Sequence, residues 1–144
     1  MLLPGLFQEL TSGSAAASVQ AALATPRANN VFIDLATKGA PGPYLVISVV
    51  AGPPAGSTLD GTSDLIDGEI QFDSYAGTPQ QAQKLSNAVR DFLMKTFNAG
   101  QLPDGTNVQF VDVTMDHNEP YEQGGTGYLY RRLLRLHAFF TEAP

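Results

Sequence analysis

Two apolar segments in the middle of the chain have the hydrophobic pattern of neighbouring β-strands. Residues 44–51 (YLVISVVA) form an almost unbroken run of apolar, mostly β-branched residues, which is typical of a strand buried on both faces. Residues 69–75 (EIQFDSY) alternate instead, so that Ile70 and Phe72 share one face and polar side chains share the other. We therefore expect two strands, joined across residues 52–67 by a loop much longer than a hairpin needs.

The segment after these strands predicts an amphipathic helix over residues 78–97. Thr78 is a suitable N-cap, Pro79 fits the first helical position, and Gln81 completes a capping box. Gly100 is free to take the left-handed conformation that ends a helix. Apolar side chains recur every three or four residues along one side, which should lie on a sheet. They are Ala82, Leu85, Val89, Phe92, Leu93 and Phe97.

Weaker patterns precede the first strand. Residues 2–10 indicate a short amphipathic helix, which Pro4 and Gly5 should confine to a late start. An alanine-rich stretch at residues 15–24 indicates a second short helix, and residues 30–36 indicate a brief edge strand or extended segment. No shift in composition separates these elements from the rest of the chain.

Two further strands are expected after the long helix. Residues 107–115 and 128–140 have strand patterns, and residues 116–126 form a polar loop between them. If adjacent strands run in opposite directions, this loop and the loop at 52–67 lie at opposite ends of the sheet. The order predicts a single α+β domain over residues 1–144. One long helix and short N-terminal helices would pack on a largely antiparallel, or mixed, four-stranded sheet.

The last predicted strand separates its side chains between two faces of the sheet. One face would carry Leu134, Leu136, Ala138 and Phe140, and the other Arg131, Leu133, Arg135, His137 and Phe139.

Composition narrows the class of protein. A chain of 144 residues is long enough to bury a hydrophobic core without disulfide bonds. It has no cysteine for disulfides or thiolate metal sites. This cysteine usage fits a reducing compartment. The N-terminus lacks the basic segment of a signal peptide, and no apolar run reaches the length of a membrane span. A net charge of −6 argues against a protein that grips nucleic-acid phosphates.

Charged residues are concentrated in three places. One acidic group crowds the 69–75 strand and the loop before it, and a second crowds the 107–115 strand and the segments on either side of it. Arg131, Arg132 and Arg135 lie together in the last strand. Such patches either bring copies of the chain together head to tail or form ordinary salt bridges on one surface. The acidic residues are Asp60, Asp64, Asp67, Glu69, Asp73, Asp104, Asp112, Asp116, Glu119 and Glu122.

The chain offers little material for catalysis. His117 and Glu119 in one loop, with His137 from the last strand, are metal-ligand types, but their spacing matches no metal signature. The glycine-rich residues 124–127 precede a strand, so they lack the setting of a phosphate-binding loop. No activated nucleophile is apparent. We expect no enzymatic activity and no cofactor, and a small ligand- or metal-binding domain is the alternative from a different class.

Several segments together resemble the tail-completion proteins of long-tailed bacteriophages, which are also called tail-terminator or tail-to-head joining proteins. The resemblance covers most of residues 1–95 and thins after Gly100, where the loop at 116–126 departs from the family pattern. It is an arrangement of small and apolar residues rather than a catalytic signature. The segments are the strand at 43–48, the loop pieces GPP at 52–54 and TLDG at 58–61, the strand at 68–75, and the helix at 78–92 with AVRDFL at 88–93.

The resemblance implies a structural virion protein, made in the cytoplasm of a bacterial host. Such a protein forms a ring, expected to be a hexamer, at the neck between head and tail. The ring ends polymerisation of the tail tube and joins the tail to the connector under the head. Its implied partners are other copies of the chain, the tail tube protein, and a connector or stopper protein on the head side. DNA would pass through the lumen without specific binding, and no membrane is involved.

The resemblance also directs attention to interface residues. Leu59, Asp60 and Leu65 are expected to touch an axial neighbour. Arg131, Arg132 and Arg135 are expected to meet acidic residues of the adjacent subunit, with Glu119 and Glu122 as candidates. The alternative within the same particle is another head–tail joining protein or a minor tail protein.

Overall fold

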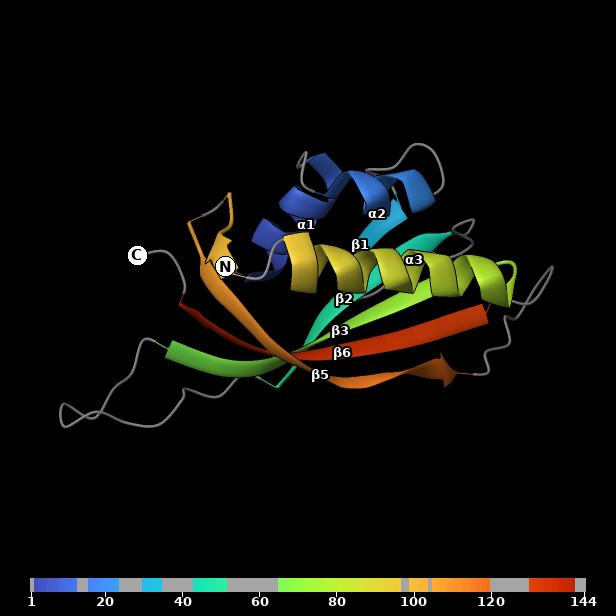
Figure 1. The fold of residues 1–144 in the computed structure, drawn as a ribbon. Coiled ribbons are helices and arrows are strands. Elements are labelled where there is room, and N and C mark those ends of the chain that lie inside the picture. The colour runs from blue at the N-terminus through green and yellow to red at the C-terminus, as the bar shows by residue number, and fades with distance from the viewer. Residues whose placement is uncertain are drawn as a thin grey trace.

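The computed structural model contains a mixed six-stranded sheet with three helices on one face (Figure 1). It describes residues 2–12, 16–23, 30–34, 43–51, 65–96, 99–103, 105–119 and 130–141. The helices are α1 (Leu2–Ser12), α2 (Ala17–Ala22) and α3 (Pro79–Asp91), the last continued by a π-helical segment (Phe92–Thr96). The strands are β1 (Val31–Ile33), β2 (Tyr44–Ala51), β3 (Leu65–Ala76), β4 (Ala99–Gln101), β5 (Asn107–Glu119) and β6 (Tyr130–Thr141).

The sheet has the strand order β1-β2-β3-β6-β5-β4. β1 is parallel to β2, and every other pairing is antiparallel. The α+β class is confirmed, but the prediction of four strands was wrong, because β1 and β4 add one short strand at each edge. β1 lies within residues 30–36, where a brief edge strand or extended segment was predicted, but this segment was not counted in the sheet. The three residues of β4 are too few for alternation to identify a strand.

The predicted capping of α3 is confirmed. The Thr78 side chain accepts a hydrogen bond from the Gln81 backbone N–H at 3.2 Å, and Pro79 is the first helical residue. Regular helix ends at Asp91, earlier than expected, and the wider π-helical turns then bury Phe92 and Leu93. Gly100, which was expected to end the helix, lies in β4 instead.

The N-terminal helix also differs from the prediction. α1 begins at Leu2, so Pro4 and Gly5 do not delay its start. Pro4 lies in the first turn, where a backbone N–H has no partner within the helix, so proline costs little there. Leu6 and Leu10 of α1 are fully buried.

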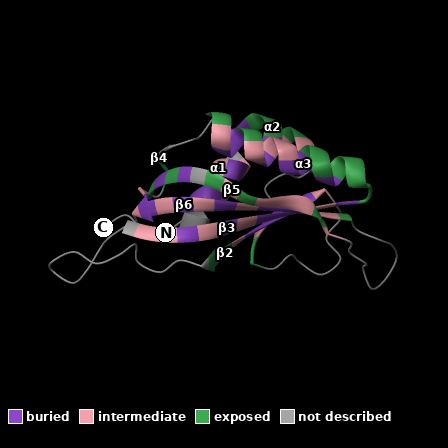
Figure 2. Ribbon diagram, turned by 60° about the horizontal axis from the view of Figure 1, so that its bottom comes forward, coloured by how far each residue is buried: buried purple, intermediate pink, exposed green. Residues whose placement is uncertain are grey.

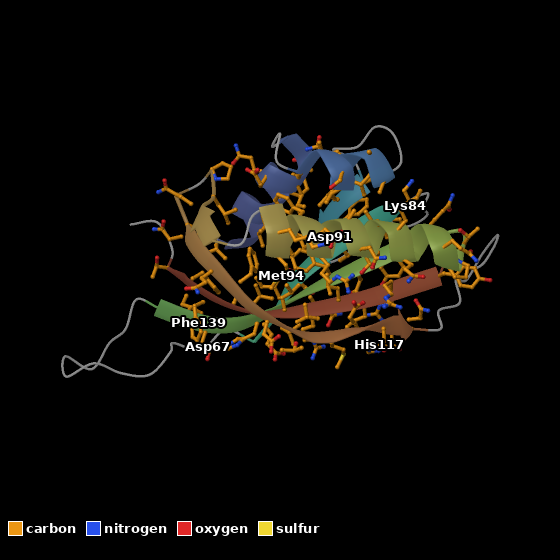
Figure 3. All side chains as sticks on the ribbon, viewed as in Figure 1. Asp67, Lys84, Asp91, Met94, His117 and Phe139 are labelled. Carbon is orange, nitrogen blue, oxygen red and sulfur yellow. The ribbon has the colours of Figure 1, made fainter. Side chains whose placement is uncertain are left out.

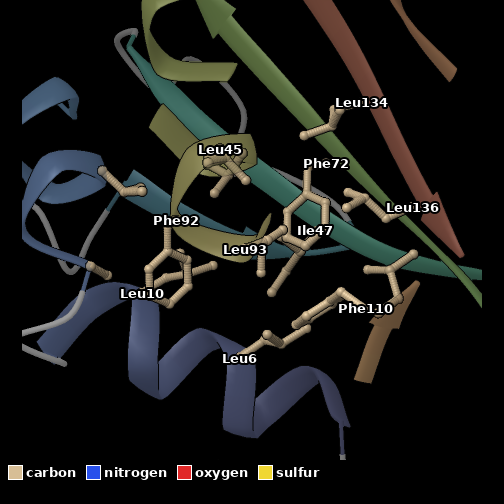
Figure 4. Packing of buried hydrophobic residues seen from close by; sticks show 14 of the residues in the cluster. Leu6, Leu10, Leu45, Ile47, Phe72, Phe92, Leu93, Phe110, Leu134 and Leu136 are labelled. Atoms are coloured by element: carbon tan, nitrogen blue, oxygen red, sulfur yellow. The ribbon is translucent and has the colours of Figure 1, made fainter. Parts of the chain in front are cut away.

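The core lies between the helices and one face of the sheet. Figure 4 shows Leu6 and Leu10 of α1 facing aromatic and aliphatic side chains from the strands and from the end of α3. Along β6 the predicted alternation is confirmed, and Figure 2 shows it as changing burial along the strand. The core face of β6 buries Leu134, Leu136, Ala138 and Phe140.

Two of the predicted strands extend into segments that were expected to be loop. β3 begins at Leu65 and β5 continues to Glu119, so two stretches expected as loop are strand. In the β3–β6 ladder Leu65 pairs with Thr141 and Ala76 pairs with Tyr130. The strand ends at which the two loops attach therefore lie at opposite ends of the sheet, as predicted.

Candidate interaction surfaces

The face of the sheet that points away from α3 is called here the open sheet face. It carries alternate residues of β3, β5 and β6, as the period of a strand requires. Among the described residues no helix lies on it, and Figure 3 shows Asp67 and His117 on this side of the sheet. Its charged members are Asp67, Glu69, Asp73, Asp112, Glu119, Arg131 and Arg135, with His117 and His137 beside them.

Cross-strand polar contacts connect β3 to β6 on the open sheet face. Arg131 Nε donates to Asp73 Oδ1 at 3.0 Å, and Arg135 donates to Gln71 Oε1 at 2.7 Å. Arg135 also lies 3.7 Å from a Glu69 carboxylate oxygen. Acids on β3 face bases on β6 because the register places these positions opposite or diagonal to each other.

The two histidines of the open sheet face belong to separate contacts. His137 pairs with Asp67, and His117 Nε2 lies 2.5 Å from Glu119 Oε1. His117 is opposite Leu133, four residues along β6 from His137, which corresponds to about 13 Å at the rise of a strand. Residues so far apart cannot share one ion. Within the described ranges, no three His, Asp or Glu residues are arranged to hold a metal.

The opposite side of the molecule carries a second charged cluster, between α3 and the ends of β5 and β6. Arg90 Nη1 of α3 donates to Asp116 Oδ2 at 2.9 Å, and Arg132 Nε of β6 donates to Asp116 Oδ1 at 2.9 Å. Arg132 Nη1 also reaches Asn118 Oδ1 at 3.1 Å. The side chains of Asp116 and Arg132 are about 15% exposed, so this contact is largely shielded from water.

The structure divides the three arginines that are neighbours in sequence. Arg131 and Arg135 lie on the open sheet face, whereas Arg132 points to the helix side. Each contacts a carboxylate of its own chain, which agrees with the reading as ordinary salt bridges. Their contact with an adjacent subunit stays a prediction.

The remaining predicted interface residues are placed only in part. Leu59, Asp60 and Glu122 lie outside the described residues, and Leu65 is the first residue of β3, with no description of its side chain. Glu119 is the last residue of β5 and is opposite Arg131 in the register. The sequence did not indicate Arg90 or Asp116 as partners, because the residues come from elements 26 positions apart in the chain.

Cations outnumber acids on the helix side, which is called here the helix-side surface. Its charged members are Glu9, Lys84, Arg90, Asp91, Lys95, Asp116 and Arg132. Lys95 lies 3.5 Å from Asp91 in an exposed pair, and Lys84 is exposed. Figure 3 shows Lys84 and Asp91 on α3, across the sheet from Asp67 and His117.

A shallow, open groove runs between α2 and α3. It has a volume of about 510 Å³ and is lined by residues such as Ser18, Ala22, Gln83, Lys84 and Asn87. These are small or polar side chains, without the large apolar and aromatic residues that usually line a small-molecule site.

Comparison with known proteins gives one clear result. The family model described as tail completion protein gp17 matches residues 6–140 of the chain. No curated protein has a sequence that matches this chain. None of the helices in the described part of the chain is long and apolar enough to cross a membrane.

Proposed function

Because the chain belongs to the phage tail completion protein gp17 family, we propose that copies of it form a hexameric ring at the neck of the virion. The ring caps the tail tube and joins the tail to the connector or stopper protein on the head side. The family match carries this proposal, because it spans residues 6–140 and so covers the described strands of the sheet except for the last residue of β6. β5 and β6, where the resemblance in sequence was thin, lie within it.

The architecture supports a subunit that lies between two axial partners. The segments that follow β2 and β5 attach at opposite ends of the sheet, so each end can contact a different axial partner. In the proposed ring, Leu59, Asp60 and Leu65 contact an axial neighbour at one end. Contacts around the ring involve Arg131, Arg132 and Arg135, with Glu119 and Glu122 among the acids.

The charge of the chain supports passage of DNA through the ring. A subunit with a net charge of −6 gives a six-membered ring that repels phosphate, so DNA moves through the lumen without being held. The role is structural rather than enzymatic, as the family is a structural one. Synthesis takes place in the cytoplasm of the bacterial host, before the protein enters the virion.

The position of the chain in the particle tests the proposal. A peptide tag at the C-terminus, detected with gold-labelled antibody under negative stain, should appear at one level between head and tail. Untagged particles serve as the control for non-specific label. A phage without the gene should yield heads and tails that do not join. Label along the tail tube or at its distal tip would contradict a neck position and favour a minor tail protein.

A further inference from the structure

The two sides of the sheet carry net charges of opposite sign. The open sheet face has five carboxylates and two arginines, and the helix-side surface has four cations and three carboxylates. With the histidines left out of the count, the net charge is about −3 on the open sheet face and about +1 on the helix-side surface. The local salt bridges therefore leave an excess of acid on the open sheet face and a small excess of base on the helix-side surface.

We infer that the helix-side surface of one copy of this chain contacts the open sheet face of the next copy. The inference rests on the proposed ring, and it identifies which two surfaces meet in it. A contact between two different patches of the same chain is heterologous, and it closes into a ring when the rotation between neighbours fits. Opposite sides of one subunit with complementary charge are what such a contact needs.

Several charges on each surface remain accessible in the single chain. On the open sheet face, Asp67, Glu69 and Glu119 keep 35–41% of their side chains exposed despite their partners. Asp112 is also exposed, opposite His137. On the helix side, Lys95 is 76% exposed. An approaching copy can therefore reach these charges without breaking the largely buried contact of Arg132 with Asp116.

A second copy fits the open sheet face better than a nucleic acid does. Its excess of carboxylates would repel phosphates. Lys84 of α3 and Lys95 of the π-helical segment after it are long, exposed cations on the opposite side. The alternative position for an acidic surface in a ring is the lumen, where it would face the passing DNA. Charge reversal on the two surfaces distinguishes a contact between subunits from a face turned to the lumen.

Charge reversal on each surface provides the test. The acidic-surface variant is Asp112→Lys with Glu119→Lys, and the helix-surface variant is Lys84→Glu with Lys95→Glu. A third protein combines all four changes in one chain, so that every contact again joins opposite charges. Self-association is measured by sedimentation velocity over a range of protein concentrations at about 0.05 M salt, where surface charges are weakly screened. Circular dichroism and thermal melting confirm that each variant is folded.

The acidic-surface variant separates a specific contact from general repulsion. Its two substitutions replace two negative charges with two positive ones and change the net charge from −6 to −2, so repulsion between copies falls. General repulsion alone therefore predicts association as strong as that of the wild type, or stronger. The proposed contact predicts the reverse: each two-residue variant should need on the order of tenfold higher concentration to associate. The four-residue variant should return close to the wild-type value.

Two results would overturn the inference. If the acidic-surface variant assembles as well as the wild type, the open sheet face is not in the contact, and a face turned to the lumen explains its charge. If the wild type stays monomeric at every concentration, the two surfaces do not attract each other. Neither result removes a neck position, which the labelling of particles tests independently.

Discussion

The contact of two arginines with Asp116 allows a specific prediction for stability. Asparagine at position 116 keeps the shape of the side chain but removes the negative charge between Arg90 and Arg132. Both guanidinium groups would remain close together without a counter-charge. We expect Asp116→Asn to destabilise the fold, because two charge-assisted hydrogen bonds weaken and two like charges then face each other.

The exposure of the three side chains sets the magnitude. Breaking a fully buried ion pair costs about 3–5 kcal/mol, whereas an exposed pair contributes at most about 1 kcal/mol. The Arg132–Asp116 pair is close to the buried limit, with side chains 16% and 15% exposed, and Arg90 is 41% exposed and more screened. The expected loss is therefore about 2–3 kcal/mol, or a fall in Tm of roughly 5–12 °C for a chain of this size.

Urea denaturation followed by far-UV circular dichroism measures this loss. The matched control is Asp91→Asn, which removes a carboxylate from α3 whose partner Lys95 is 3.5 Å away and well exposed. Asp91 is the last residue of the regular helix, where a negative charge opposes the helix dipole, so the control should change stability by no more than about 0.5 kcal/mol. Equal effects of the two substitutions, or an unchanged midpoint for Asp116→Asn, would refute the reasoning.

Two further substitutions test single side chains. Thr78→Ala removes the acceptor for the Gln81 N–H at the start of α3, and it should cost about 1 kcal/mol in the same denaturation assay, while Thr78→Ser should cost much less; equal losses for the two would exclude a capping role. Ser74→Ala should leave stability unchanged or raise it slightly, because the buried Ser74 hydroxyl has no hydrogen-bond partner among the described residues. A loss above about 1 kcal/mol in the melting profile of Ser74→Ala would show that this hydroxyl does have a partner.

The elements with a strong period were predictable from the sequence. α3 has a cap, an apolar stripe and a proline at its first position, and all three are local features. β2, β3 and β6 have either a continuous apolar run or strict alternation. The π-helical turns after Asp91 were not predictable, because they depend on how Phe92 and Leu93 pack against the rest of the core.

The end of β5 shows why a polar segment was taken for a loop. Residues 116–119 (DHNE) have no apolar position, and a strand usually shows at least one apolar face. In the structure both faces are satisfied by polar contacts. Asp116 and Asn118 meet Arg132 on the helix side, and His117 meets Glu119 on the other. The segment is a strand because β6 supplies the partners, and the sequence of β5 alone does not contain that information.

The arginines of β6 show how much of the charged surface can be predicted from the alternation of side chains along a strand. Positions 131 and 135 differ by an even number and position 132 by an odd one, so the sequence already implies that Arg132 points the other way. The sequence does not contain the register of the strands. That register places Asp73 near Arg131 and Glu69 near Arg135, and it brings Asp116 next to Arg132. Once the register is known, the arginines no longer form one basic patch. Arg132 joins the cations of α3, while Arg131 and Arg135 only partly offset the acids around them. The division therefore replaces a single basic patch with two opposite sides of different sign, and a subunit of that kind can repeat the same contact around a ring.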